Sequence, residues 1–289
     1  MTEPAPIEDL QELLADHAYL ADRGLATAIH LARSLGQPLL LEGESGVGKT
    51  EVAKAVAEAY NLELIRLQCY EGIDAAQALY EWDYPRQLLY LKALSESADG
   101  HDATDEVFGR RFLIERPLLA ALQAGAGAVL LIDEIDRADD EFEAFLLEVL
   151  SDFQVTIPEI GTISAEQRPT VILTSNRTRE LHDALKRRCL YHWIDFPDLE
   201  REIAIVRTRA PEVTEALTRR VAAAVAGMRS LDLIKKPGIA ETINWAQALD
   251  LLGVSELKAS AVSATLGTVI KEHDDLTLVG GQLDAILDG

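Results

Sequence analysis

Short apolar runs alternate with stretches of helical periodicity along the first two thirds of the chain. A short apolar run bounded by turn residues predicts a buried strand. Such runs occupy residues 38–41, 62–67, 112–114, 129–132, 171–174 and 191–194. Helical spacing covers residues 8–35 and 51–60 and recurs between later strands. This alternation predicts an α/β fold with a doubly wound parallel sheet sandwiched by helices, which binds ligands at the carboxyl ends of its strands.

Two stretches depart from this alternation. The segment at about 70–90 carries five aromatic residues, namely Tyr70, Tyr80, Trp82, Tyr84 and Tyr90. Aromatic side chains here either pack onto the sheet or face a partner. At about 154–167, two β-prone triplets flank Pro158-Glu159-Ile160, which predicts a small β-hairpin.

The pattern becomes helical throughout beyond Phe196-Pro197. The expected helices span residues 198–209, 212–228, 240–252 and 255–272. Pro211 suits a helix start and Gly253 suits a helix end. We therefore expect two domains, an α/β domain of residues 1–196 and a smaller, all-helical lid domain of residues 197–289.

Charge and composition narrow the classes of partner. The chain has 289 residues and a formal net charge of −22, which repels nucleic acid and anionic membranes. Because of this charge, we do not expect nucleic-acid binding. We do not expect membrane insertion either, because no apolar run is long enough to span a bilayer and the N-terminus lacks signal-peptide features. The two cysteines, Cys69 and Cys189, are expected to be reduced and buried, which fits a cytoplasmic protein.

A phosphate-binding loop follows the first expected strand. It reads Gly43-Glu44-Ser45-Gly46-Val47-Gly48-Lys49-Thr50 and precedes an expected helix. Backbone N–H groups at a helix N-terminus bind anions, and the glycines let the backbone curl around phosphates. Lys49 can reach the β- and γ-phosphates, and the Thr50 hydroxyl can bind Mg²⁺. The loop predicts a site for ATP with Mg²⁺.

An acidic pair ends the apolar strand at 129–132. Asp133 is placed to hold Mg²⁺, partly through water, and so joins Thr50 as an expected metal ligand. Glu134 could polarise a water for attack on the γ-phosphate. A kinase that transfers phosphate to a metabolite does not need this glutamate, so the pair favours ATP hydrolysis.

Further polar residues complete the expected catalytic set. Asn176 follows the strand at 171–174, where it could orient the attacking water, although asparagine also ends strands for structural reasons. Arg187 and Arg188 precede the last strand, where a guanidinium can neutralise charge on a transferring phosphate. Such a finger in a neighbouring subunit would place the ATP site between subunits; the alternative is a basic helix end that compensates the helix dipole.

The order of loop, Asp-Glu pair, asparagine, arginine and helical lid resembles the AAA+ ATPases, and the match covers nearly the whole chain. The chain is most similar to the MoxR family in three features: the run Leu39-Leu40-Leu41-Glu42-Gly43, the string Asp133-Glu134-Ile135-Asp136-Arg137-Ala138, and the extra segments at about 70–90 and 154–167, where the family carries a helix-2 insert and a pre-sensor hairpin. The stretch Lys236-Pro237-Gly238-Ile239-Ala240-Glu241-Thr242-Ile243-Asn244-Trp245 resembles the branch linked to maturation of carbon monoxide dehydrogenase-type molybdenum enzymes.

This resemblance implies a homo-oligomer, a hexameric ring, that remodels or matures a client metalloenzyme together with a von Willebrand factor A-type partner protein. It also favours Arg188 over Arg187 as the finger, because the family's arginine directly precedes the strand. The chain departs from the family at Thr242, where relatives carry a sensor-2 arginine. Lys235 or Lys236 could substitute for it.

Two other functions remain open at this point. An ATP-gated assembly module, in which hydrolysis is incidental, fits the missing lid arginine. A DNA-acting AAA+ protein fits the motifs but not the charge of −22.

Overall fold

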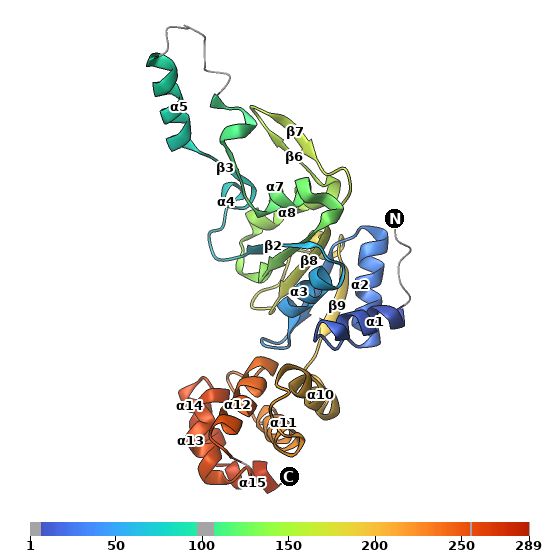
Figure 1. The fold of residues 1–289 in the computed structure, drawn as a ribbon, viewed down its shortest axis with the longest axis vertical. Coiled ribbons are helices and arrows are strands. Elements are labelled where there is room, and N and C mark those ends of the chain that lie inside the picture. Colours follow the sequence, from blue (N-terminus) through green and yellow to red (C-terminus); the bar gives the residue numbers. More distant parts are fainter. Residues whose placement is uncertain (1–6, 97–106, 255, 289) are drawn as a thin grey trace. The chain divides into compact units, whose positions relative to one another are not determined.

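The computed structural model describes residues 7–96, 107–254 and 256–288 (Figure 1). These residues form two compact units, which are described separately. The first comprises Met1–Leu10, Arg23–Glu42 and Ala53–His192, and the second comprises Gln11–Asp22, Gly43–Val52 and Trp193–Gly289, as far as these ranges are described. The phosphate loop therefore groups with the C-terminal helices.

The first unit is built on a five-stranded sheet of order β2-β5-β8-β1-β9. Its strands are β1 (Leu39–Gly43), β2 (Glu63–Gln68), β5 (Ala128–Asp133), β8 (Thr170–Ser175) and β9 (Leu190–Ile194). β2 pairs with β5, β5 with β8, and β8 with β1, all in parallel. The predicted α/β fold with a parallel sheet is confirmed.

Helices cover both faces of this sheet, because alternate strand residues point to opposite faces and both sets are buried. One set, which includes Leu130 and Leu173, packs with apolar residues of α7 (Pro117–Ala124) and α8 (Asp140–Asp152). On the opposite side lie α2 (Arg23–Leu35) and α3 (Lys49–Ala59) (Figure 1). The short elements η2 (Gly125–Gly127), η3 (Ile135–Arg137) and α9 (Asp183–Lys186) complete the connections.

Two sequence-based expectations for residues 1–196 were wrong in detail. The helix expected over 8–35 is interrupted, since α1 (Ile7–Asp16) ends before a turn in which Ala18 has a φ of 56°. The strand expected at 112–114 lies outside the parallel sheet. It is β4 (Leu113–Glu115), which pairs antiparallel with β3 (Tyr80–Trp82). An apolar run of this length carries no information about its pairing partner.

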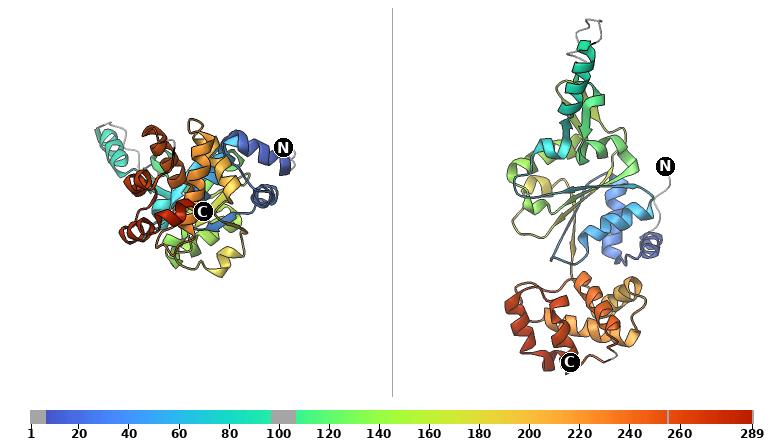
Figure 2. Two further views of the ribbon diagram at one scale, coloured as in Figure 1. Left: turned by 90° about the horizontal axis from the view of Figure 1, so that it is seen from below. Right: turned by 60° about the vertical axis from the view of Figure 1, so that its left-hand side comes forward.

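The departures from alternation form two small antiparallel sheets. The first insertion contains α4 (Ala75–Leu79), β3, α5 (Tyr84–Glu96), η1 (Arg110–Phe112) and β4. The hairpin expected at about 154–167 consists of β6 (Gln154–Ile157) and β7 (Gly161–Ser164). Figure 2 shows α5 extending away from the sheet of the first unit.

The C-terminal part of the second unit is all-helical. Its helices are α10 (Leu199–Arg209), α11 (Glu215–Arg229), α12 (Ile239–Leu251), α13 (Ala259–Val269), α14 (His273–Gly280) and α15 (Leu283–Asp288). The helix expected over 255–272 is shorter than predicted, and two further helices follow it. Fully buried Trp245 anchors the apolar core and donates a hydrogen bond to Thr265 Oγ1 (2.8 Å). Among the described residues, no helix is long and apolar enough to cross a membrane.

Candidate nucleotide-binding site

The phosphate loop connects β1 to α3, which begins at Lys49, two residues before the helix start expected at residue 51. Its close packing requires glycine at two positions. A Cβ on Gly43 would lie 2.1 Å from the carbonyl oxygen of Ile194, so only glycine allows β9 to approach the loop. Gly46 has a φ of +83°, which also favours glycine. The loop therefore has the tightly curled backbone that phosphate binding needs.

The Lys49 side chain is buried against the loop itself. Its ammonium group donates hydrogen bonds to the carbonyl oxygens of Gly43 (2.8 Å) and Glu44 (2.6 Å). These bonds hold a positive charge inside the curve of the backbone. The arrangement fits recognition of an anionic group by charge and by directed donors.

The loop contacts the start of α12 within the second unit. Ile239 N donates a hydrogen bond to the Gly46 carbonyl (2.9 Å). A Cβ on Gly46 would lie 2.7 Å from the Gly238 Cα, so the two glycines pack backbone to backbone. Glu241 closes a capping interaction by accepting from Gly238 N (3.1 Å). Any displacement of the first turn of α12 is therefore felt at the loop.

Asp133 and Glu134 stand at the carboxyl end of β5, and neighbouring β8 organises both. The Thr174 hydroxyl donates to Asp133 Oδ1 (2.6 Å) and accepts from Glu134 N (2.9 Å). Asp133 is 2% exposed, so this bond fixes a buried carboxylate. Thr174 thus sets the position of one acid and the backbone of the other.

The edge strand β2 contacts the same two acids. Arg66 donates from Nε to Asp133 Oδ2 (3.0 Å) and pairs with it a second time through its terminal nitrogen. Gln68 donates to Glu134 Oε2 (3.1 Å), which also accepts from Arg137 (3.1 Å). Each of the two carboxylates therefore accepts a hydrogen bond from a side chain of β2.

Glu134 occupies an unusual backbone conformation. Its φ is 55° and its ψ is 50°, in the left-handed region that costs energy for a residue with a Cβ. Strain of this kind persists only where the surroundings impose it and is concentrated at functional sites. It turns the chain sharply at the end of β5, immediately after Asp133.

Asn176 follows β8 directly, as expected, and is half-buried. The next residue, Arg177, also has a left-handed φ (57°), and its guanidinium lies 3.9 Å from the buried Glu42 carboxylate at the end of β1. Tyr191 contacts the same carboxylate, and its pKa is raised by burial first and by Glu42 second. The Arg177–Glu42 ion pair therefore joins the ends of β8 and β1 beside Asn176.

Arg187 and Arg188 lie at the C-terminal end of α9, and both are exposed. Within the described residues, neither side chain forms an ion pair or a side-chain hydrogen bond. With His182, Asp183 and Ala184 they line a surface pocket of about 420 Å³. The two guanidiniums are thus presented outward, as a contact with another molecule would require.

A buried network fixes α9 to α8. Glu143 on α8 is completely buried, accepts from His182 N (2.8 Å) and forms an ion pair with Arg179. Arg179 also donates to the Ala138 carbonyl (2.8 Å). In the same region Thr178 donates to Asp136 Oδ2 through its backbone (2.9 Å) and its hydroxyl (2.7 Å). The loop between Asn176 and the arginines is therefore tied to the segment after Glu134.

Thr242 is used inside the lid. It is fully buried, and its hydroxyl has two acceptors within reach of its single proton, Glu202 Oε1 (2.8 Å) and Gly238 O (3.1 Å). Arg229 completes this cluster, donating to both Glu202 oxygens (2.6 and 2.8 Å) and to Pro237 O (2.7 Å). The Thr242 hydroxyl thus orders the segment before α12. Lys235 and Lys236 are both exposed in that segment.

Both cysteines are free thiols. Cys69 is buried and Cys189 is half-buried. Burial raises the pKa of Cys69 to about 12, and the nearby Asp133 carboxylate contributes to this rise; burial alone raises the pKa of Cys189 to about 12. Thiols with such pKa values are protonated and unreactive near neutral pH.

Sequence reasoning missed Thr174, Arg66 and Gln68. A signal for them was present, since each is a polar residue near the end of an expected strand. Recognising them needed the strand order, which places β5 between β2 and β8. No group of three or more His, Cys, Asp or Glu side chains able to bind a metal occurs in the described ranges.

Solved structures share this fold. Two variants of Thermotoga maritima RuvB align with TM-scores of 0.51 at 19% identity. One alignment covers 91% of this chain and 70% of the RuvB chain, and the other covers 96% and 78%. At this identity the similarity concerns the fold alone.

The sheet, the loop and the helical C-terminal region define a P-loop NTPase of the AAA+ class, whose members bind nucleotide, typically with Mg²⁺. Residues 38–189, more than half of the chain, match a family described as the AAA domain of the dynein-related subfamily. The chain belongs to this family of AAA+ ATPases.

Similar sequences occur in staphylococci. An uncharacterized protein of Staphylococcus epidermidis is 27% identical over 194 residues, which is 65% of this chain and 66% of the relative. One of Staphylococcus haemolyticus is 30% identical over 172 residues, 57% of this chain and 58% of the relative. The match thus spans about two thirds of these relatives at most.

Proposed function

We propose that this protein is a MoxR-type AAA+ chaperone that hydrolyses ATP to remodel or mature a protein partner. One observation carries the ATPase part of the proposal. Three neighbouring parallel strands, β1, β8 and β5, end in the phosphate loop, in Asn176 and in the acidic pair Asp133-Glu134. Parallel strands have their carboxyl ends at one edge, where nucleotides bind in such sheets.

Each residue has a specific role in this proposal. The loop backbone from Gly43 to Thr50 and the Lys49 ammonium bind the phosphates. Thr50 and Asp133 hold Mg²⁺, which neutralises charge on the phosphates when it is bound. Glu134 accepts a proton from the attacking water, and Asn176 orients that water towards the γ-phosphate.

We further propose that Arg188, or Arg187 beside it, acts on the ATP of a neighbouring subunit. Their exposure supports this role, since an arginine that completes its own subunit's site would not need to face outward. An arginine supplied in trans is worth about 10³–10⁵ in rate in related phosphoryl transfers. It requires a closed homo-oligomer, for which we propose a hexameric ring.

The client in this proposal is a metalloenzyme, such as a molybdenum hydroxylase of the carbon monoxide dehydrogenase type, and a von Willebrand factor A-type protein is the adaptor. Support comes from the resemblance of residues 236–245 and from the two antiparallel insertions, which contain none of the proposed nucleotide-binding or catalytic residues. The charge of −22 disfavours DNA as the substrate.

The decisive experiment compares wild type with Glu134→Gln. The variant keeps the shape of the side chain but cannot accept a proton, so we expect ATP binding within about threefold of wild type and a kcat lower by at least about 10². Binding is measured with a fluorescent ATP analogue and turnover by phosphate release. Equal turnover in the variant would remove Glu134 from the mechanism.

A second function is favoured by Thr242, whose hydroxyl is used within the lid rather than for a nucleotide. In this alternative ATP binding drives assembly and hydrolysis is incidental. Glu134→Gln would then still support maturation of the client in cells. Loss of maturation with retained assembly favours the chaperone.

A further inference from the structure

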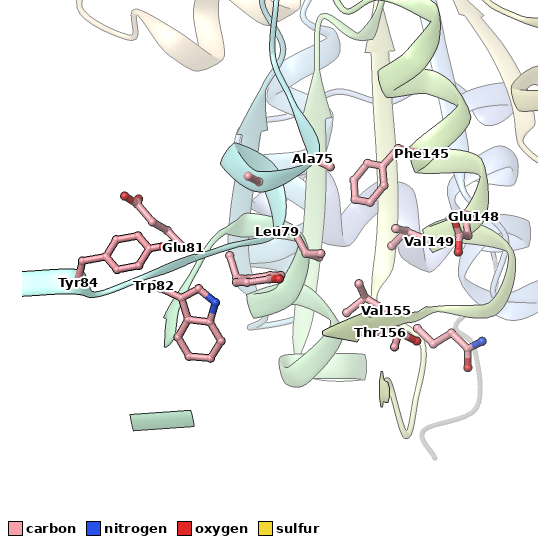
Figure 3. Close-up of a pocket in the computed structure, with 13 residues that line it drawn as sticks. Ala75, Leu79, Glu81, Trp82, Tyr84, Phe145, Glu148, Val149, Val155 and Thr156 are labelled. Atoms are coloured by element: carbon pink, nitrogen blue, oxygen red, sulfur yellow. The ribbon is translucent and has the colours of Figure 1, made fainter. Parts of the chain in front are cut away.

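A groove of about 520 Å³ lies between the first insertion and the hairpin, and none of the residues proposed to bind or hydrolyse ATP lines it. Figure 3 shows its walls. One wall is formed by α4 and β3, and the other by α8 and β6. Tyr80, Glu81, Trp82 and Tyr84 of the first insertion line it, as do Glu148 of α8 and Val155 of β6. A groove of this volume accommodates a few side chains of a bound segment.

Aromatic side chains make one wall rigid. Trp82 packs edge-on against both Tyr80 (ring centroids 6.0 Å apart) and Phe108 (5.4 Å). Tyr84, by contrast, is 59% exposed at the rim, and exposed Leu88 and Leu89 continue this apolar surface along α5. An exposed patch of clustered large apolar residues marks an interaction surface.

Two strands with open edges border the groove. β3 pairs only with β4, and β6 only with β7, among the strands of the described residues. Asp83 N donates to Phe112 O, and Arg116 N donates to Leu79 O, so hydrogen bonds to the β4 side fall at alternate residues. The backbone N–H and C=O groups of Tyr80 and Trp82, which lie between these positions, therefore point to the edge that β4 does not cover. Open edges of this kind bind extended peptides by strand addition.

The charge at the groove is acidic. Glu148 lines it, and Glu159 lies close enough to raise the pKa of Tyr80, after the larger effect of burial. In the described part of the chain neither carboxylate has an ion-pair partner. Glu81 also lines the groove and pairs with Arg116. Two unpaired carboxylates beside apolar walls are complementary to Lys or Arg side chains.

From these observations we infer that the groove binds an extended client segment in which apolar residues alternate with Lys or Arg. The inference rests on the proposed function, because it names the kind of polypeptide that the ATPase would engage. Apolar side chains of the segment enter between Tyr80 and Val155, and its cationic side chains reach Glu148. Its backbone adds to the open edge of β3.

The test uses two fluorescein-labelled synthetic peptides of equal length, one alternating Val and Lys and the other alternating Val and Glu. Fluorescence anisotropy is measured with the full-length protein and no nucleotide. We expect the cationic peptide to bind, more weakly as salt is raised, and the anionic peptide not to bind. Glu148→Lys should weaken binding about tenfold, and Tyr84→Ala should weaken it by a similar factor.

Matched controls separate the groove from general charge and apolarity. Glu12→Lys makes the same charge change on an exposed residue of α1, and Leu251→Ala truncates an exposed apolar residue of α12. Both should bind the cationic peptide as wild type does. ATP turnover without peptide should be unchanged in Glu148→Lys, and Glu134→Gln should bind the peptide normally.

The outcomes distinguish this inference from the proposed function. Peptide binding without any ATPase activity supports the groove and refutes the ATPase. An active ATPase that binds neither peptide, or that binds the cationic peptide equally well after Glu148→Lys and Tyr84→Ala, refutes the groove. Equal affinity for both peptides refutes the cationic preference and leaves the inference wrong as stated.

Discussion

The Thr174 hydroxyl bonds to both parts of the acidic pair at the end of β5. It donates to the buried Asp133 carboxylate and accepts from the backbone of Glu134, whose left-handed conformation would otherwise relax. A hydrogen bond to a buried charge contributes more than one between neutral groups. At the scale of single residues, the neighbouring strand therefore controls the proposed catalytic carboxylates.

Thr174→Val tests this control, because valine keeps the shape of the side chain but loses both hydrogen bonds. We expect kcat for ATP to fall about 10- to 100-fold, from the loss of about 1.5–3 kcal/mol of charge-assisted bonding. Nucleotide affinity should change less, since the loop residues are untouched. Steady-state phosphate release and titration with a fluorescent ATP analogue measure the two effects.

Thr170→Val is the matched control for Thr174→Val. Thr170 begins the same strand and is half-buried. Its substitution should leave kcat unchanged. If both variants hydrolyse ATP at the wild-type rate, Thr174 has no positioning role.

Sequence motifs were enough to locate Asp133, Glu134 and the phosphate loop, because each of these motifs consists of residues that are adjacent in the sequence. Arg66, Gln68 and Thr174 could not be assigned in this way. Their partners are 67, 66 and 41 residues away in sequence, and only strand pairing brings them together. The same limit applies to Thr242, whose bonding to Glu202 depends on how α10 and α12 pack.

At the scale of elements, α9 presents Arg187 and Arg188, but only four residues form this helix. So short a helix is unstable alone. Its position depends on Glu143 of α8, which accepts from His182 N and pairs with Arg179. The two exposed arginines are therefore oriented by a buried carboxylate on another helix.

Glu143→Leu should reduce the free energy of unfolding by about 3 kcal/mol, because it leaves a backbone N–H and a guanidinium without their partner. Urea denaturation measures the change. Asp140→Asn is the control, since Asp140 pairs with the same Arg179 but is 83% exposed. Its effect should stay below about 0.5 kcal/mol. Equal effects of the two substitutions would show that the buried position of Glu143 is unimportant.

The contact between Gly46 and Gly238 links the phosphate loop to α12 at the same scale. In Gly238→Ala the new Cβ would lie 2.7 Å from the Gly46 Cα and from Glu241 Oε2, so the helix start or the loop must shift. Because small displacements in a phosphate site are costly, we expect kcat/KM for ATP to fall about tenfold. Steady-state kinetics over a range of ATP concentrations measure this change.

Gly267→Ala is the matched control for Gly238→Ala. Gly267 lies within α13, and a Cβ added there would meet open space, with no described heavy atom beyond its own helix backbone within 4 Å. Alanine at this position should raise stability by about 0.5–1 kcal/mol through helix propensity and leave the kinetics unchanged. Wild-type kinetics in Gly238→Ala would disprove the coupling of loop and helix.

Hydrophobic patterning predicted the elements of the parallel sheet well, because strands buried on both faces are continuous apolar runs. It failed at β4, whose three residues are too few to reveal a separate sheet. It also failed beyond α13, where α14 and α15 have only eight and six residues, too few for helical spacing to be recognised. The groove between β3 and β6 could not be predicted, since it depends on the packing of two insertions.

At the scale of the whole molecule, the proposed assembly requires that each active site take its finger from a neighbour. A mixture of two inactive variants tests this requirement. Glu134→Gln lacks the proposed base but keeps Arg188, and Arg188→Ala lacks the finger but keeps Glu134. In a mixed ring, an Arg188→Ala subunit beside a Glu134→Gln subunit has a complete site, because each supplies what the other lacks.

Random mixing of equal amounts should restore about a quarter of the wild-type turnover, since a quarter of the ordered pairs are complementary. Each variant alone should be lower by at least about 10². The subunits are mixed under dissociating conditions and reassembled, and phosphate release is compared with that of each variant alone. Arg187→Ala, mixed in the same way, identifies which arginine serves as the finger. A mixture no more active than its components would mean that the site is completed within one subunit, and the exposed arginines would then need another role.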